Sequence, residues 1–345
     1  MRDLIFRPLR WLLVISIVIS LWSYGFITML LDSPINLSKE DSNKISFTIP
    51  KGSNLDEVNA RLATQNIISQ PKFISLYARL ADKIDIKAGD YWLESSDSPR
   101  SLLEKFSQGI VIQHTVTFVE GWTFSQWVDH LLSIKQFQLG IDLDVDQLLA
   151  DINPDIGNPE GWFFPDTYAF TSSDLLFDVL NRAHQRMQKI LAAEWKSRAD
   201  NLPYSTPYEA LIMASIIEKE TGRVNERSEI AGVFVRRLKR GMRLQTDPTV
   251  IYGMGTDFKG DIRRKDLKRY TPYNTYLIDG LPPTPISMPG SGAIKAALHP
   301  KDGSSLYFVA RGDGGHIFSD SLEEHSAAVR RFQIDERRKD YKTLP

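Results

Sequence analysis

The sequence contains no cysteine, which excludes disulfide frameworks, thiolate metal sites and cysteine nucleophiles. It also carries almost no net charge, because 42 Lys and Arg residues against 43 Asp and Glu residues give −1 at pH 7. A nearly neutral chain lacks the broad positive surface that binds nucleic acid, so nucleic acid is not an expected partner. The length of 345 residues is sufficient for about two domains, each with its own core.

Several catalytic motifs are absent as well. The sequence has no H-E-x-x-H zinc motif, no G-x-S-x-G motif and no Walker phosphate-binding motif. The six histidines, at positions 114, 130, 184, 299, 316 and 325, do not have the spacing of metal ligands. We therefore expect neither a metal ion nor an organic cofactor.

One long segment, residues 11–31, has no charged side chain, and as a helix it would span roughly 32 Å, enough for a bilayer core. Arg2, Arg7 and Arg10 precede it and Asp32 follows it. The positive-inside rule then places residues 1–10 in the cytoplasm and the rest of the chain outside. A cleaved signal peptide or a buried core helix are the alternatives, but the segment is too long for the first and too uniformly uncharged for the second.

A small subdomain is predicted after this segment. Residues 32–43 are polar and indicate a linker, and residues 44–110 form the subdomain. Its pattern predicts a strand at 45–49, a helix with Leu55, Val58 and Leu62 on its apolar face, a helix at 71–80, a strand at 88–93 and a short helix at 101–106. The order strand–helix–helix–strand over residues 44–93 resembles the LysM glycan-binding module.

The remainder, residues 111–345, is predicted to be a larger mixed α/β catalytic domain, so the fold class is α+β. Helices are expected at 174–198, 207–221 and 228–240, and a hairpin at 306–310 and 316–318. Between residues 242 and 289 the chain is rich in Gly, Pro, Asp, Tyr and Thr and has little periodicity. Such an irregular stretch inside a compact domain favours a functional site.

Glu218 is the most unusual carboxylate in the sequence. It ends a helical segment that is apolar on nearly all sides and should be buried, whereas Glu220 points elsewhere. Burial disfavours the carboxylate anion, so the pKa of Glu218 should rise until the group can donate a proton near neutral pH. Such a group suits a general acid for glycosidic cleavage. The structural alternative is a buried ion pair with Arg236 or Arg237.

Two short bursts of polar and aromatic residues follow, at 245–249 and 273–276. Amide, hydroxyl and aromatic groups of this kind suit a sugar polymer, which offers hydroxyl groups and flat faces. Taken singly, each burst is also typical of turn chemistry. The candidate substrate-binding residues in and near these bursts are Gln245, Thr246, Asp247, Thr249, Tyr252, Tyr273, Asn274 and Tyr276, with His316 in the later hairpin.

Six motifs then occur in order along the chain: EGWFFPDTY, IIEKET, GMRLQTDPTVIYG, YNTY, GLPP and GGHIFS. Together with the N-terminal apolar segment they closely resemble the endolytic murein transglycosylase family, the membrane-anchored YceG-like proteins of bacteria. Departures are mild: Thr284 and Pro285 follow GLPP where glycine is usual, and Ser287 and Met288 precede Pro289.

The resemblance implies a lyase that cleaves MurNAc–GlcNAc linkages in nascent peptidoglycan and leaves 1,6-anhydro-MurNAc ends, which terminates glycan elongation. It places the family's catalytic glutamate on Glu218. It further implies a bacterial inner-membrane protein with a periplasmic catalytic part, with peptidoglycan strands as substrate and peptidoglycan synthases as possible partners.

The number of carboxylates needed separates the alternatives. A conventional glycosidase needs two, ~5–5.5 Å apart if retaining and ~6.5–9.5 Å apart if inverting. A lytic transglycosylase can use one, because the nucleophile is the C6 hydroxyl of the substrate itself. Asp247 and Glu226 are candidate second carboxylates, so a muramidase that hydrolyses the same bond stays open. A non-catalytic, membrane-anchored scaffold that binds peptidoglycan is the other alternative.

Overall fold

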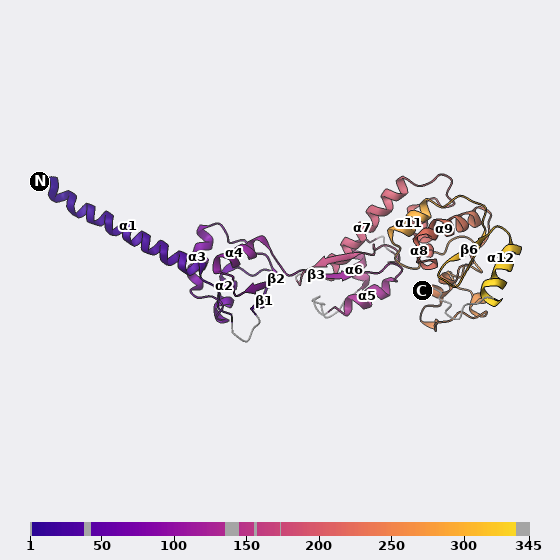
Figure 1. Ribbon diagram of the computed structural model, residues 1–345, viewed down its shortest axis with the longest axis horizontal. Helices are drawn as coiled ribbons and strands as arrows, with labels where there is room; N and C mark the ends of the chain where they lie inside the picture. Colours follow the sequence, from indigo (N-terminus) through magenta and orange to yellow (C-terminus); the bar gives the residue numbers. More distant parts are fainter. Residues whose placement is uncertain (1, 38–42, 135–144, 155–156, 173, 336–345) are drawn as a thin grey trace. The chain divides into compact units, whose positions relative to one another are not determined.

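The computed structural model describes residues 2–37, 43–134, 145–154, 157–172 and 174–335. The chain divides into two compact units (Figure 1): unit 1 comprises residues 1–114 and 169–174, and unit 2 comprises residues 115–168 and 175–345. The boundaries between the units fall within β3 (His114–Thr117) and β4 (Thr167–Phe170). Both helices and small sheets are present, which confirms the predicted α+β class.

Unit 1 combines one long helix with a small α/β structure. The long helix is α1 (Arg2–Asp32). It is followed in chain order by β1 (Lys44–Ile49), α2 (Leu55–Thr64), α3 (Pro71–Leu80), β2 (Gly89–Glu94) and α4 (Pro99–Gln108). The strands β1 and β2 pair in antiparallel register from Lys44 opposite Glu94 to Ile49 opposite Gly89. The strands and short helices therefore lie where the sequence pattern predicts them.

Local sequence signals explain these elements. Asn54 caps α2 and exchanges hydrogen bonds with Glu57 in a capping box, which satisfies backbone N–H groups that the first turn leaves free. Val58 and Leu62 of the predicted apolar face are buried in the core of unit 1. Alternation along β1 buries Phe47 and Ile49 against the same core.

Helix α1 begins farther towards the N-terminus than the predicted apolar segment. Within it, Leu13–Asp32 is long and apolar enough to cross a membrane, with a mean hydropathy of 2.0. The predicted linker is partly packed against unit 1, since Ile35 is buried and its backbone N–H donates to the carbonyl of Asp97 at 2.8 Å. Residues 38–42 of that linker lie outside the described residues.

Unit 2 contains most of the remaining elements. They are α5 (Phe124–Leu132), α6 (Val145–Ile152), α7 (Leu176–Lys196), α8 (Pro207–Glu220), α9 (Val224–Lys239), α10 (Asp247–Met254), α11 (Ser291–Leu298), β5 (Tyr307–Ala310), β6 (His316–Ser319) and α12 (Leu322–Val329). Helices α7 and α8 match the prediction, α9 begins at Val224 rather than at the predicted residue 228, and β5 and β6 form the predicted hairpin. Short 3₁₀ turns occur at 255–257 and 266–268, and a π-helical turn at 330–335.

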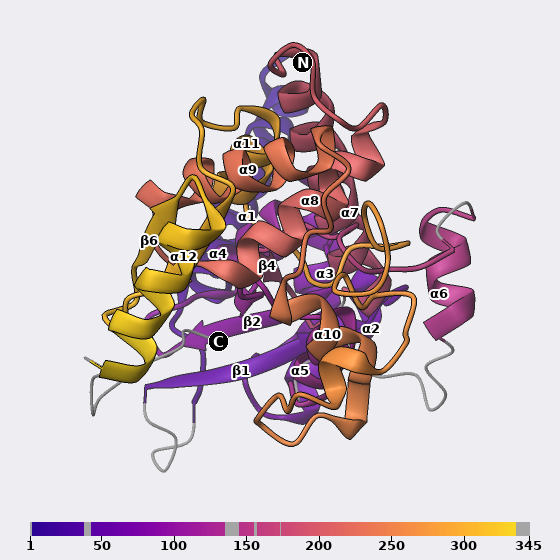
Figure 2. The same cartoon turned by 90° about the vertical axis from the view of Figure 1, so that its right-hand side faces the viewer.

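Helix α8 occupies the centre of unit 2, where it packs against α7, α9 and α11 (Figure 2). Thr206 and Glu209 form a capping box at its start, and Pro207 occupies the first turn. Every side chain from Ala210 to Ile217 is buried, which is the physical reason that its sequence is apolar on all sides. The fold therefore delivers Glu218 at the end of a fully enclosed helix.

Candidate active site

The carboxylate of Glu218 lies at the C-terminal end of α8 with only 5% of its side chain exposed. Its Oε1 accepts a hydrogen bond from an Arg227 amino group at 2.7 Å, and its Oε2 accepts one from the backbone N–H of Gly290 at 2.9 Å. Burial raises the pKa of Glu218, and the charge of Arg227 and the Gly290 N–H oppose this rise without cancelling it. The raised pKa is the one that the sequence predicts.

Arg227, on α9, is shared between two carboxylates. The same amino group that binds Glu218 also lies 3.3 Å from Oε2 of Glu120. Glu120 is more exposed, and its negative charge is one of the influences that raise the pKa of Glu218. Arg227 thus holds a buried and an accessible carboxylate together.

The alternative prediction, that Glu218 forms an ion pair with Arg236 or Arg237, is wrong. Arg236 donates to the backbone carbonyls of Lys301 and Ser305, and Arg237 donates to carbonyls at positions 243, 244 and 306. Both lie near the C-terminal end of α9, whereas Arg227 lies in its second turn. Helical geometry brings the start of α9, rather than its end, next to the end of α8.

Two glycines at the start of α11 permit the close packing of this site. A Cβ atom on Gly290 would overlap the Glu120 carboxylate, and one on Gly292 would overlap the Arg227 guanidinium. Gly290 is the N-cap of α11 and donates its N–H to Glu218. The N-terminus of a helix favours an anion, so α11 supports the ionised form of Glu218.

A second, separate network begins at Glu220. Its carboxylate accepts a hydrogen bond from the Thr246 hydroxyl, and burial raises the pKa of Glu220 to about 7. The backbone N–H of Thr246 donates to the hydroxyl of Thr275 at 3.0 Å. Thr249 is fully buried and hydrogen-bonds the carbonyl of Thr246 and the hydroxyl of Thr275. The structure thus brings Thr246 and Thr249 together in the interior.

Gln245 and Asp247 flank Thr246 and are exposed. Gln245 has a left-handed backbone (φ 52°), and its N–H donates to the carbonyl of Thr275. Asp247 accepts a hydrogen bond from the hydroxyl of Tyr276 at 2.7 Å. Burial, assisted by the charge of Asp247, raises the pKa of Tyr276. The predicted residues Gln245, Asp247 and Tyr276 therefore lie towards the surface, next to the buried threonines.

Tyr252 and Tyr273 form an aromatic pair with ring centroids 4.8 Å apart in an edge-to-face arrangement. The hydroxyl of Tyr273 lies 2.8 Å from that of Thr284. The side chain of Tyr252 hydrogen-bonds to Glu160, a buried residue of the EGWFFPDTY motif that also accepts the backbone N–H of Phe124. Burial raises the pKa of Glu160 to about 7.

The last two predicted residues have different surroundings. Asn274 is fully buried, donates to the carbonyl of Arg269 at 2.7 Å and accepts the N–H of Tyr276 at 3.0 Å, so it fixes the fold of the loop. His316, on β6, places its Nδ1 2.8 Å from Oε2 of Glu226. Glu226 is the neighbour of Arg227 in the sequence, so β6 contacts the same part of α9 that holds Glu218.

Four residues of the site escape sequence reasoning: Glu120, Glu160, Arg227 and Gly290. Glu120 precedes the pair Gly121–Trp122, as Glu160 precedes Gly161–Trp162 in the EGWFFPDTY motif, and this shared context was a signal for it. Arg227 and Gly290 have no local signal, because only the packing of α9 and α11 brings them to Glu218. Among the described residues, no group of three or more His, Asp or Glu side chains is placed to hold a metal ion.

Stability should depend on pH through Glu160. Its folded pKa of about 7 exceeds the ordinary value of 4.5 for glutamate, so between these pH values the folded protein retains a proton that the unfolded chain releases. Glu160 alone therefore lowers the free energy of unfolding by about 3 kcal/mol as pH rises through this window, in addition to the contributions of Glu218 and Glu220, whose pKa values burial also raises. Glu160→Gln should remove that decrease, measured by urea unfolding at pH 5 and pH 8.

The matched control is Glu323→Gln, the same chemical change at an exposed position of α12. It should preserve the pH dependence of the unchanged protein. If Glu160→Gln and Glu323→Gln lose the same free energy between pH 5 and pH 8, the ionisation of Glu160 is not coupled to folding.

Comparison with known proteins places this site in context. The sequence matches the YceG-like family over residues 47–331. It is 30% identical to an endolytic murein transglycosylase of Bacillus subtilis, with 86% of this chain and 87% of that protein covered. It is 27% identical to an endolytic murein transglycosylase of Streptococcus pneumoniae, with 92% and 63% covered. A crystal structure of a YceG-like protein from Listeria monocytogenes matches with a TM-score of 0.53 and 30% identity, covering 83% of this chain and 99% of that one.

Proposed function

The chain belongs to the YceG-like family, and from this membership we propose that it is an endolytic lytic transglycosylase that cleaves MurNAc–GlcNAc linkages in peptidoglycan. The observation that carries the proposal is the buried carboxyl group of Glu218, whose raised pKa suits a group that must first donate a proton. The relatives in Bacillus subtilis and Streptococcus pneumoniae are named for this activity.

In the first step Glu218 donates its proton to the glycosidic oxygen, and the bond between C1 of MurNAc and that oxygen breaks. In the second step the C6 hydroxyl of the same MurNAc attacks C1, and the Glu218 carboxylate accepts the hydroxyl proton. The C1–O6 bond forms a 1,6-anhydro ring, and Glu218 regains the protonation state with which it began. No water is consumed, and the nucleophile is already held beside C1 by the sugar ring.

The two partners of Glu218 fit its change of role. Burial raises the pKa of Glu218 and so favours the protonated form, in which the group can act as an acid. After the proton has left, the Arg227 guanidinium and the Gly290 N–H stabilise the carboxylate through charge-assisted hydrogen bonds. The same contacts hold the carboxylate in one orientation, so that acid and base steps use one geometry.

Substrate contact is assigned to the accessible members of the predicted set. The exposed polar groups of Gln245 and Asp247 and the half-buried rings of Tyr252, Tyr273 and Tyr276 are the ones that a glycan strand can meet. A glycan offers them hydroxyl groups and flat sugar faces. The buried Thr246, Thr249 and Asn274 would act by positioning this surface, and His316 by orienting Glu226.

Hydrolysis by a muramidase is the second candidate, because Glu120 lies against the same arginine as Glu218. Glu120 rather than Asp247 or Glu226 is therefore the second carboxylate to consider. As a general base it would activate a water molecule, and the product would carry a reducing MurNAc end.

Product mass distinguishes the two reactions. Purified full-length protein is incubated with uncross-linked glycan strands, and the released fragments are analysed by mass spectrometry. A transglycosylase gives anhydro ends that are lighter than reducing ends by the mass of one water molecule. Reducing ends alone would establish hydrolysis, and binding without released fragments would favour a non-catalytic scaffold.

Location and partners complete the proposal. The apolar part of α1 is suited to a single span of the bacterial inner membrane. The arginines before it favour a cytoplasmic N-terminus, which would place the catalytic part in the periplasm. Residues 44–110 are proposed as a LysM-like subdomain that contacts the same glycan strand. Peptidoglycan synthases, which make the nascent strands, are the proposed protein partners.

A further inference from the structure

Helix α3 has a buried face and an apolar face that the protein leaves uncovered. Ile74 and Ala78 lie in the core of unit 1. Phe73, Leu76 and Leu80 follow helical spacing along the other side, and their exposed fractions are 52%, 52% and 81%. A row of large apolar side chains in water is costly, so such a surface indicates something that covers it.

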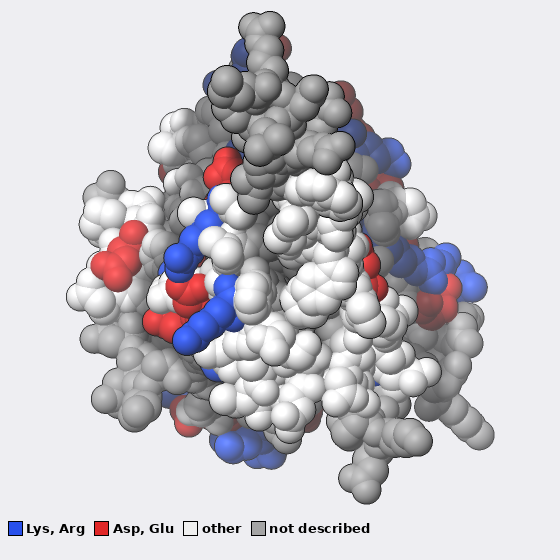
Figure 3. All heavy atoms as spheres, turned by 90° about the vertical axis from the view of Figure 1, so that its left-hand side faces the viewer, with Lys and Arg blue, Asp and Glu red and all other residues white. Residues whose placement is uncertain are grey.

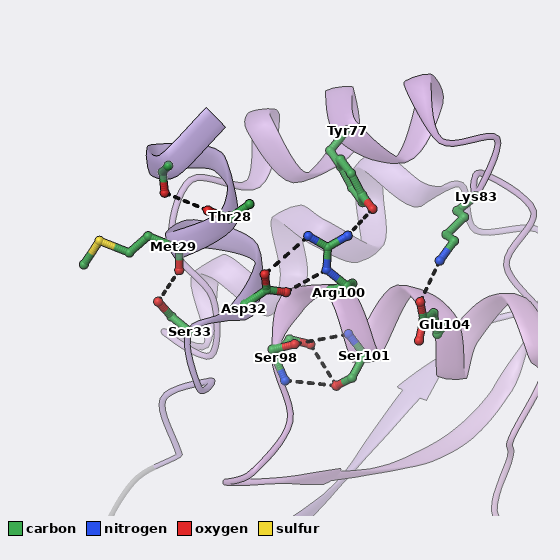
Figure 4. A network of polar contacts seen from close by, with 11 residues as sticks. Thr28, Met29, Asp32, Ser33, Tyr77, Lys83, Ser98, Arg100, Ser101 and Glu104 are labelled. Carbon is green, nitrogen blue, oxygen red and sulfur yellow. Dashed lines mark hydrogen bonds and ion pairs between the residues drawn. The ribbon is translucent and has the colours of Figure 1, made fainter. Parts of the chain in front are cut away.

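The place of α3 in unit 1 identifies what covers it. Asp32, the last residue of α1, accepts a hydrogen bond from Nε of Arg100 at 2.6 Å, and the same guanidinium donates to the hydroxyl of Tyr77 on α3 (Figure 4). Leu31 is 1% exposed and belongs to the core of unit 1. The end of α1 is therefore packed into unit 1, and a single side chain, that of Arg100, connects it to α3. The junction at Asp32 is part of the folded unit and not an extended linker.

The charges beside the apolar row fit a lipid surface. Lys72 and Arg79 are exposed and lie on one flank of the row, seven residues apart and hence on the same side of the helix, and Arg79 also forms an ion pair with Asp56 of α2. In the view from the α1 end, uncharged side chains cover a broad area, and a cluster of Lys, Arg, Asp and Glu side chains lies beside it (Figure 3). An apolar stripe flanked by basic side chains is typical of helices that lie in the membrane interface, where long side chains reach the headgroups.

We propose that α3 is a second membrane contact, whose Phe73, Leu76 and Leu80 enter the surface of the bilayer that α1 spans, in the leaflet where α1 ends. This rests on the proposed membrane anchoring by α1. Lipid is the occupant because α1 continues directly into unit 1 at Asp32, and Arg100 links Asp32 to Tyr77 of α3. These links keep α3 beside the end of the membrane span. A protein partner would have to displace lipid from this face. Because α1 and α3 belong to the same compact unit, contacts of both helices with the bilayer fix the orientation of unit 1 relative to it.

The absence of cysteine makes a direct test possible, since one introduced cysteine carries a label at one known position. The full-length protein is reconstituted into vesicles of phosphatidylethanolamine and phosphatidylglycerol. An environment-sensitive fluorophore is attached at Leu80→Cys, and quenching by lipids brominated on their acyl chains is measured. Ile110→Cys is the matched control, because Ile110 is another exposed apolar residue of unit 1, beyond the end of α4 that is distant from Arg100. Val18→Cys reports on α1 itself.

Quenching at Leu80→Cys should be several-fold stronger than at Ile110→Cys and should approach that at Val18→Cys. Adding Phe73→Asp and Leu76→Asp to the Leu80→Cys protein should reduce it to the Ile110→Cys level, while circular dichroism shows that the fold is retained. Quenching at Val18→Cys but not at Leu80→Cys would overturn the α3 contact and leave the anchor intact. A spectral shift at Leu80→Cys without bromolipid quenching would assign the face to protein instead. Absence of quenching at Val18→Cys would overturn the anchor and the α3 contact together.

Discussion

Glu218→Gln should lower the rate of glycan cleavage by about 10²–10⁴-fold or more, because the variant loses both the acid that protonates the leaving oxygen and the base that accepts the C6 hydroxyl proton. Glutamine has nearly the same shape as glutamate, and its one carbonyl oxygen can still accept a hydrogen bond from either Arg227 or Gly290, although not from both. The fold should therefore be retained, and the loss should lie in the chemical step. The rate of appearance of anhydro ends, measured by mass spectrometry, checks this.

Two comparisons isolate the role of the side chain. Glu323→Gln, an exposed position on α12, should cleave at the unchanged rate. Glu218→Gln should still bind sedimented peptidoglycan and should unfold at a temperature close to that of the unchanged protein. Cleavage by Glu218→Gln at a normal rate would remove the basis of the proposed mechanism.

Arg227→Met should have the second largest effect. The arginine compensates a carboxylate with 5% side-chain exposure, and removing one partner of such a pair costs about 3–5 kcal/mol of unfolding free energy when the other stays charged. Glu218 can avoid this cost by binding a proton. The destabilisation should therefore be largest above the raised pKa of Glu218 and small at pH 5, which urea unfolding at several pH values would show.

The same substitution should move the pH profile of the reaction. The charge of Arg227 lowers the pKa of Glu218, and the charge of Glu120 raises it. Removing the arginine should therefore raise this pKa, and removing the Glu120 charge should lower it. The alkaline limb of kcat/KM, where the catalytic acid loses its proton, should shift to higher pH in Arg227→Met and to lower pH in Glu120→Gln. Arg227→Lys keeps the positive charge and should shift the limb less than Arg227→Met, even if the methionine variant folds poorly. Shifts of the same sign in Arg227→Met and Glu120→Gln would contradict the assignment of Glu218 as the acid.

The sequence predicted the burial of Glu218 because its signal is local. An entire helix without a polar face can only be an interior helix, and a carboxylate at its end must then be buried. The hairpin β5–β6 was equally predictable, since alternating apolar residues flank a turn rich in glycine. Features of this kind depend on neighbours within a few residues.

The partners of Glu218 depend on contacts between distant segments, which one sequence does not encode visibly. Arg227 and Gly290 reach the carboxylate from the starts of two helices, and Glu120 contacts Arg227 from a turn. Helices α10 and α11 were missed because each has eight residues and begins beside Pro or Gly, so that turn chemistry dominates their local signal. Most of the irregular region from 242 to 289 nevertheless has defined backbone structure, held by Asn274 and the buried threonines.

The glycine pair at the start of α11 also bears on how the protein is made. Glu120 is synthesised well before Gly290, and Glu218 needs the α11 backbone for one of its two hydrogen bonds. A chain that is still being synthesised therefore contains Glu218 before it contains the segment that orients this carboxylate. The hydrogen-bond arrangement of Glu218 is complete only after residue 290 has been made and α11 has folded.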